Sequence, residues 1–279
     1  MNLQPLLMPM SVSLLLLAGT TPTLAQPSAE GTDQVPARNA DKPRSPITQV
    51  LFKPSRSGPP PTTRGAGSRN DRYCAQDTPS KNEPTLTALV PPNQSSLTWA
   101  ERPTFWVYLP KTSARQIVLS VKEEDSQQHS QRFLPITGES GIIDIQFDKN
   151  SPPLEVGKSY QWAIVLVCGD RPSPNDPVVT AWVQRAVPSQ QINNQQAALE
   201  QAVGYGEQGI WYDALTTLAV ARRSQPDNPA LAKIWADFLA QPSVGLGTIA
   251  NEPLRRVLAP VRRSRLSVGL GTIANEPLR

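Results

Sequence analysis

The chain has 279 residues, enough for one or two domains, and its 30 prolines indicate that a good part of it is not packed core. Its net charge of +4 comes from two terminal stretches. Residues 26–72 hold eight Lys and Arg against four acids and residues 256–279 hold five against one, which leaves the part between them at −4. A nucleic-acid-binding domain gathers Lys and Arg on its folded face, so this distribution argues against that class of protein.

Residues 1–25 have the pattern of a secretory signal peptide. A Leu-rich run ends in TPTLAQ, which puts Thr23 and Ala25 at the −3 and −1 positions of a cleavage site. The basic residues usual before such a run are missing, so an uncleaved anchor is the alternative, although the run is shorter than the roughly 20 residues of a spanning helix. No later stretch is apolar and long enough to cross a bilayer. We therefore expect export to the periplasm, or to the extracellular space or cell envelope, with no transmembrane anchor after cleavage.

Residues 26–72 form a Pro-rich basic linker that we expect to be disordered. Beyond ITQVLF at 47–52 they hold too few apolar residues to offset the entropy of ordering. Export gives meaning to Cys74 and Cys168, the only two cysteines, because an oxidising compartment favours a disulfide between them. The alternative is two buried free thiols. Closing a loop of this length stabilises a fold by roughly 4–5 kcal/mol.

Residues 73–188 contain seven short apolar runs separated by Pro, Gly, Asn and Asp, which predict the strands of a β-sandwich. Within them, LEVGKSYQW at 154–162 resembles the tyrosine corner of immunoglobulin-like and fibronectin type III domains, in which a Tyr hydroxyl bonds back to the chain just before it. Tyr160 occupies that position, and Gly157 lies in the turn. Cys168 follows eight residues later rather than two, so we expect the disulfide to clamp the segment before the first strand to the end of a long strand.

From residue 189 the hydrophobic period becomes helical, and residues 195–226 resemble a tetratricopeptide repeat. Gly209 stands at the turn between the two helices. A further helix in NPALAKIWADFLAQ is expected to cap the hairpin, and the whole is expected to pack on the sandwich or on a partner. The residues that match the repeat are Ala202, Tyr205, Ala214, Ala221 and Pro226.

Five motifs together resemble the cyanobacterial family called domain of unknown function 928, over about residues 73–254: TALVP, ERPTFWVYLP, LEVGKSYQW, GIWYDALTTLA and SVGLGTIANEPL. The resemblance implies an exported cyanobacterial protein with no assigned activity, so no family site is carried over. The expected fold is mainly β with a C-terminal α part: an immunoglobulin-like β-sandwich (73–188), then a TPR-like helical hairpin and capping helix (189–254). The sequence SVGLGTIANEPLR recurs at 267–279, and we interpret residues 255–279 as a duplicated, disordered and dispensable basic tail.

Residue types that carry catalysis or bind metals are scarce. The only histidine, His129, lies in a polar run and is expected in a solvated turn. Motifs of the H-x-x-x-H, C-x-x-C and G-x-S-x-G types are missing, and Gly245 and Gly247 lack the third glycine of a dinucleotide loop. Asp144 and Asp148 are interpreted as solvated surface charge. We expect no catalytic residue, no metal and no cofactor, and hence not an enzyme.

The aromatic residues are the better candidates for binding. Trp106 and Tyr108 share one face of a strand, and Trp211 and Tyr212 stand at the helical turn, where we expect them at the interface with the sandwich. Burial in the core is the alternative for all four. We therefore expect a non-enzymatic interaction or assembly protein that binds an envelope protein or polysaccharide. A carbohydrate-binding module is the alternative, and a hydrolase is a third hypothesis that no motif supports.

Overall fold

A computed structural model describes residues 46–54, 73–79, 82–92, 96–124, 126, 129–146, 149–189 and 197–256, all within a unit that begins at Pro46. The predicted signal peptide, most of the linker, Asp148 and the second copy of the repeat lie outside these residues. In chain order the elements are β1 (Thr87–Ala88), β2 (Ser96–Thr98), β3 (Thr104–Leu109), β4 (Gln116–Glu123), β5 (His129–Pro135), β6 (Gly141–Gln146), β7 (Ser159–Val167), β8 (Val178–Arg185), α1 (Ala198–Glu207), α2 (Trp211–Ser224), α3 (Pro229–Ala240), the 3-10 helix η1 (Gly247–Ile249) and β9 (Leu254–Arg255).

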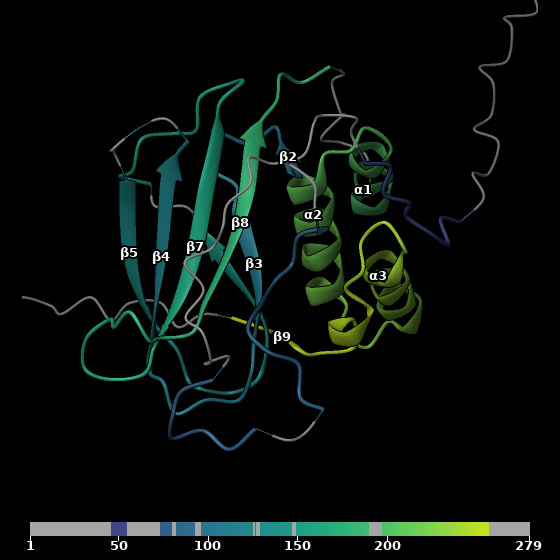
Figure 1. The fold of residues 1–279 in the computed structure, drawn as a ribbon. Helices are drawn as coiled ribbons and strands as arrows, with labels where there is room; N and C mark the ends of the chain where they lie inside the picture. Colours follow the sequence, from purple (N-terminus) through teal and green to yellow (C-terminus); the bar gives the residue numbers. More distant parts are fainter. Residues whose placement is uncertain are drawn as a thin grey trace, which may run out of the picture. The chain divides into compact units, whose positions relative to one another are not determined.

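The described strands form two sheets, of order β1-β3-β6-β9 and β2-β8-β7-β4-β5 (Figure 1). Each of the seven predicted segments contains one strand, so the prediction of a mainly β fold with C-terminal helices is confirmed. The alternation of apolar residues did not predict β2 and β9, which have three and two residues and pair in parallel with β8 and β6. The period of two needs a longer run to be visible.

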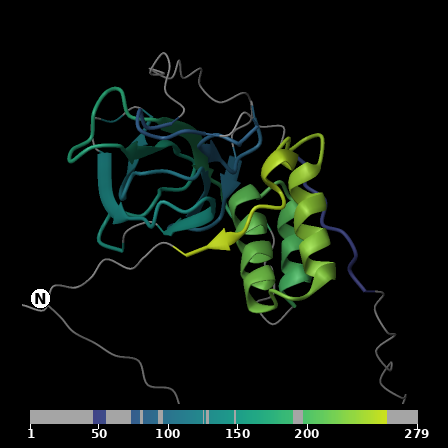
Figure 2. The same ribbon diagram turned by 90° about the horizontal axis from the view of Figure 1, so that it is seen from below.

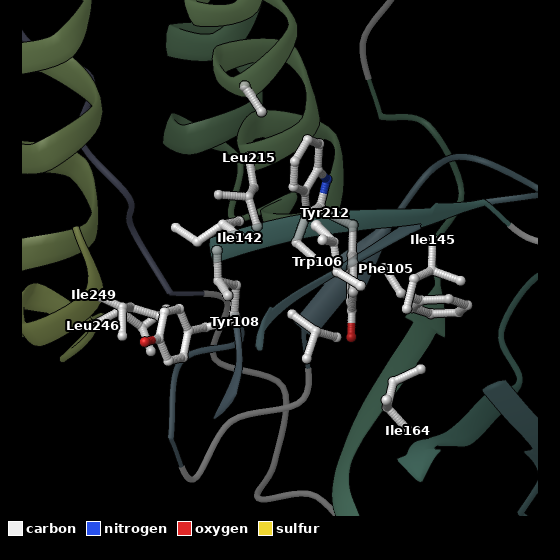
Figure 3. Packing of buried hydrophobic residues seen from close by; sticks show 14 of the residues in the cluster. Phe105, Trp106, Tyr108, Ile142, Ile145, Ile164, Tyr212, Leu215, Leu246 and Ile249 are labelled. Atoms are coloured by element: carbon white, nitrogen blue, oxygen red, sulfur yellow. The ribbon is translucent and has the colours of Figure 1, made fainter. Parts of the chain in front are cut away.

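Strand β3 lies in the middle of three layers. Phe105 faces the five-stranded sheet, where its ring centroid is 4.9 Å from that of Trp162 on β7. Trp106 faces the helices, and its Nε1 donates to the Thr216 hydroxyl on α2 at 3.0 Å. Both faces of β3 are therefore buried, which explains why TFWVYL is apolar throughout rather than alternating. Figure 3 shows buried residues of this region, with Tyr108 turned toward Leu246 and Ile249.

The three helices form the outer layer on the four-stranded sheet (Figure 2). Helix α3 has a clear start signal, because the Asn228 side chain accepts hydrogen bonds from the Ala230 and Leu231 backbone amides and Pro229 takes the first position. One face of α3 is buried against the other helices and β3, with Trp235 1% exposed and its ring 6.5 Å from that of Trp106. The helices and the sheets thus share one core.

Residues 46–54 correct the prediction that 26–72 is a disordered linker throughout. Val50 and Phe52 are buried, and the Lys53 amide donates to the Gly206 carbonyl of α1 at 3.0 Å. The Gln241 side chain binds both neighbouring backbone groups, accepting from Phe52 N and donating to Val50 O. Position 206 needs glycine because a Cβ there would collide with the Leu51 carbonyl oxygen.

Candidate functional site

The four aromatic residues predicted as binding candidates lie in the core. Trp106, Tyr108, Trp211 and Tyr212 are each at most 1% exposed, so none presents a ring face to a ligand. Trp211 donates from Nε1 to the Leu89 carbonyl at 2.8 Å and stacks on Phe238, at 5.1 Å between ring centroids. The prediction of a binding surface at these residues is therefore wrong, because packing of the helices on the sheets buries both the Trp106–Tyr108 and the Trp211–Tyr212 pair.

Tyr212 links the helices to the sheets. Its hydroxyl accepts from Trp162 Nε1 at 2.7 Å and donates to the Trp182 carbonyl at 2.8 Å. Burial raises its pKa well above the usual value, so the hydroxyl stays protonated and able to donate. The ring meets Phe105 edge-on at 5.9 Å, and Figure 3 shows Tyr212 reaching from α2 toward Phe105. Trp211 and Tyr212 thus lie where the helices meet the sandwich.

The residues predicted to have structural roles occupy special positions. The Tyr160 hydroxyl accepts from the Glu155 amide at 3.0 Å, which is the contact expected of a tyrosine corner, and Gly157 in that turn has φ +83°. Gly209 has φ +72° between α1 and α2. The small residues Ala214 and Ala221 are buried in the helical layer.

The predicted disulfide joins Cys74 to Cys168, which follows directly after β7. Cys74 is buried, and the Gln76 side-chain amide donates to the Cys168 carbonyl at 2.9 Å. The bond ties residues 73–79 to the end of the longest strand. Because it spans 94 residues, its cross-link restricts the unfolded chain strongly.

Two predictions about polar residues are corrected. His129 begins β5 instead of lying in a turn. Asp144 is not a solvated charge: it lies on the helix-facing side of β6 opposite Trp106, and its Oδ1 is 2.7 Å from Nη2 of Arg223 on α2.

Within the described ranges, His, Cys, Asp and Glu form no group of three or more that could hold a metal ion. Among the helices that the structure describes, none is long and apolar enough to cross a membrane.

A cleft of about 240 Å³ opens where the first turns of α2 meet the loop between β2 and β3. On one side, Asp213 Oδ2 accepts from the Thr98 hydroxyl at 2.8 Å and the Trp99 amide at 3.2 Å. Burial raises the pKa of this carboxyl, and those hydrogen bonds oppose the rise. The cleft is also lined by Arg102, Thr104, Tyr205, Thr216 and Thr217.

The lining residues of this cleft carry hydroxyl, guanidinium and carboxylate groups. Asp213 is the only carboxylate among its lining residues. Arg102 is anchored by donating from Nη1 to the Ser151 carbonyl at 2.6 Å. Burial and the nearby Asp213 charge raise the pKa of Tyr205, whose ring meets Trp99 edge-on at 5.5 Å. The walls thus offer hydroxyls, one guanidinium and one carboxylate to a small polar molecule.

A second candidate surface is the outer face of the five-stranded sheet, turned away from the core. The pairing aligns Phe133 with Val118, Val118 with Val165 and Val165 with Val178, a set that we call the outer apolar row. Phe133 is 49% and Val178 37% exposed. The row crosses from β8 to β5, which is an edge strand.

The flanking positions on this face are also uncharged. One neighbouring row contains Gln131, Ser120, Ala163 and Thr180, and the other Pro135, Gln116 and Val167. A solvent-facing side of an antiparallel sheet is ordinarily polar and charged. The nearest charge on this face is the exposed Lys122, one row beyond Ser120. Exposed Phe and Val side chains within these three uncharged rows make this part of the face a candidate surface for contact with another molecule. The sequence alone does not reveal this surface, because the register between strands, not the order along any one strand, assembles it.

The described residues thus form a two-sheet protein with a layer of three helices on one sheet. A family model, Domain of Unknown Function (DUF928), matches residues 64–254, and the chain belongs to this family. No curated protein matches the chain.

Two solved structures show likeness to parts of the chain. One is the solution structure of the fn3 domain of human collagen alpha-1(XX) chain, at 11% identity and a TM-score of 0.24, covering 44% of this chain and 96% of that domain. The other is Astrotactin-2, a vertebrate-specific, perforin-like membrane protein involved in neuronal development, at 14% identity and a TM-score of 0.24, covering 60% of this chain and 33% of that one.

Proposed function

We propose that this protein is an exported, non-enzymatic interaction module of the cyanobacterial cell envelope that binds a protein partner through the outer apolar row. The observation that carries the proposal is this row, where Phe133 and Val178 stay exposed and the two neighbouring rows hold no charged residue. Burying such a patch against a partner removes apolar surface from water, which favours association. The row ends on β5, an edge strand of the described sheet, where an extended partner segment could add a further strand.

Export is supported by the signal-like sequence of residues 1–25 and by the disulfide, since disulfides persist in oxidising compartments. In the proposed architecture the two sheets are an immunoglobulin-like sandwich that presents the surface, and α1 and α2 are a TPR-like hairpin. Their three-residue connection through Gly209 and their buried alanines support this interpretation. In this arrangement the helices stabilise the sandwich from its other side.

The test is affinity capture from a periplasmic extract with the mature protein. We expect the parent chain to retain a specific protein that Phe133→Ser/Val178→Ser loses. The matched control is Val220→Ser, which removes a 55% exposed valine from α2, and it should retain the partner. Equal capture by all three chains, or none by the parent, contradicts a protein partner on this face.

A carbohydrate-binding module is the second candidate function, and the Asp213 cleft favours it. Threonine hydroxyls, a carboxylate and an anchored arginine suit the hydroxyl groups of a single sugar ring, and a volume of about 240 Å³ suits a ligand of that size. Tryptophan rings offer little surface for stacking on a sugar, because five of the six Trp are at most 9% exposed.

A glycan array probed with the parent and Thr217→Val tests this second candidate. Thr217 lines the cleft, whereas Thr180 is exposed on β8, so Thr180→Val is the matched control. Binding that weakens only in Thr217→Val supports the cleft. If neither the array nor the capture yields a specific ligand, both binding functions fail together.

A further inference from the structure

The segment SVGLGTIANEPLR at 243–255 is held by extensive contacts. Val244, Leu246 and Ile249 are each at most 7% exposed, and Figure 3 shows the last two beside Tyr108. The Leu246 amide donates to the Leu239 carbonyl of α3 at 3.0 Å. At the other end of the segment, the Pro253 carbonyl accepts from the Ile142 amide at 2.8 Å. This segment fastens α3 to the four-stranded sheet.

The strand end of the segment is equally specific. Leu254 pairs in parallel with Ile142 as β9, at the edge of the sheet. The Arg255 side chain binds the Ser140 carbonyl, and the Arg255 carbonyl accepts from Arg223 Nη2 at 2.6 Å. Gly245, at φ +70°, allows the turn after α3. We call the surface of α3, β6 and Tyr108 that holds residues 243–255 the docking groove.

The same thirteen residues recur at 267–279, with Leu270 and Ile273 in the places of Leu246 and Ile249. Because the two copies have the same side chains, the docking groove can bind either copy through the same contacts. We propose that residues 267–279 are a second ligand for this groove, and that they replace residues 243–255 of the same chain whenever the first copy is displaced. The inference is independent of the proposed function.

The length of the connections decides which copy is bound. The first copy follows α3 after two residues, whereas docking of the second requires residues 243–266 to close as a loop. The entropy of closing a loop of this length disfavours the second copy on the order of 100-fold. The first copy is therefore the one bound in the parent chain. The second copy, which we call the reserve copy, binds only when substitutions weaken the first.

Charged substitutions in each copy test the proposal by thermal unfolding of the full chain. Leu270→Asp/Ile273→Asp should leave Tm unchanged. Leu246→Asp/Ile249→Asp should lower Tm by about 6–12 °C, because the reserve copy docks at the cost of the loop. The chain with all four substitutions should lose at least twice as much. If the first-copy variant melts with the fourfold variant, or does not fold, the proposal is overturned.

Trypsin gives a direct readout in the same chains. Cleavage after Arg265 frees residues 266–279, which gel filtration and mass spectrometry should find bound to the body of the first-copy variant and lost from the parent. Loss from both chains overturns the proposal. Sedimentation should show the same oligomeric state for the parent and the first-copy variant. If only the first-copy variant associates more at higher concentration, the tail binds a neighbouring molecule, and docking within one chain is overturned.

Discussion

At the scale of single residues, the junction between helices and sheets depends on one hydroxyl. Tyr212 satisfies both the indole N–H of Trp162 and the carbonyl of Trp182, and all of these groups are removed from water. A buried donor or acceptor that loses its partner costs more than an ordinary hydrogen bond contributes. The position therefore requires tyrosine rather than simply a large ring.

Tyr212→Phe keeps the ring and removes the hydroxyl, so the buried Trp162 indole N–H loses its acceptor and the Trp182 carbonyl loses one donor. We expect the free energy of unfolding to fall by about 2–4 kcal/mol in urea titrations. Tyr205→Phe at the half-buried cleft wall is the control and should change it by less than about 0.5 kcal/mol. Similar losses for the two variants would show that the hydroxyl bridge contributes nothing special.

Asp213 predicts a pH dependence of stability. Burial raises its pKa in the folded chain above the unfolded value, so the folded state binds the proton more tightly. This stability is fully present below the unfolded pKa, near 3.8, and is lost as pH rises through the folded pKa. Asp213→Asn cannot ionise, so it should gain stability relative to the parent between acidic and neutral pH. Urea titrations at several pH values measure the difference, and a constant or opposite trend contradicts the assignment.

At the scale of elements, residues 46–54 behave as part of the fold. Adjacent side chains have opposite environments, since Phe52 is 6% exposed and touches Trp211 edge-on at 4.9 Å, whereas Leu51 is 45% exposed. Phe52→Ala should cost about 3–5 kcal/mol of unfolding free energy and Leu51→Ala less than about 1 kcal/mol. Chemical denaturation of both variants checks the contrast. Equal, small effects would return this segment to the linker.

The disulfide belongs to the same scale, because it fastens residues 73–79 to the end of β7. Replacing both cysteines by serine should lower the free energy of unfolding by about 4–5 kcal/mol, since the bond closes a loop spanning 94 residues in the unfolded chain. The parent, purified after export and denatured without reductant, should show no free thiols. Two titrating thiols would refute the bond in the exported protein.

At the scale of the whole molecule, the sequence predicted the features that depend on residues close together in the chain, such as single strands and turns. The apolar run at residues 141–146 and the motif LEVGKSYQW around Tyr160 depend on neighbours in sequence, and the structure has the predicted strand and the predicted tyrosine contact there. The fate of ITQVLF could not be predicted in this way. Its burial depends on Gly206 and Gln241, which lie more than 150 residues further along the chain.

The candidate surfaces were harder to predict for the same reason. Phe133 and Val178 become neighbours of one row only through the register of four strands. The Asp213 cleft requires α2 to pack beside the loop after β2. Conversely, Trp106 and Trp211 suggested binding because their side chains are large, yet tertiary packing buried them.

The affinity of the captured partner decides whether the outer apolar row binds it, and it is measured in parallel for the parent, Phe133→Ser/Val178→Ser and Val220→Ser. We expect Phe133→Ser/Val178→Ser to raise Kd about tenfold or more, because it removes the two large exposed apolar side chains of the row. Val220→Ser should stay within about twofold of the parent. Binding that is unchanged by the substitutions in the outer apolar row would contradict the claim that this face of the sheet recognises the partner.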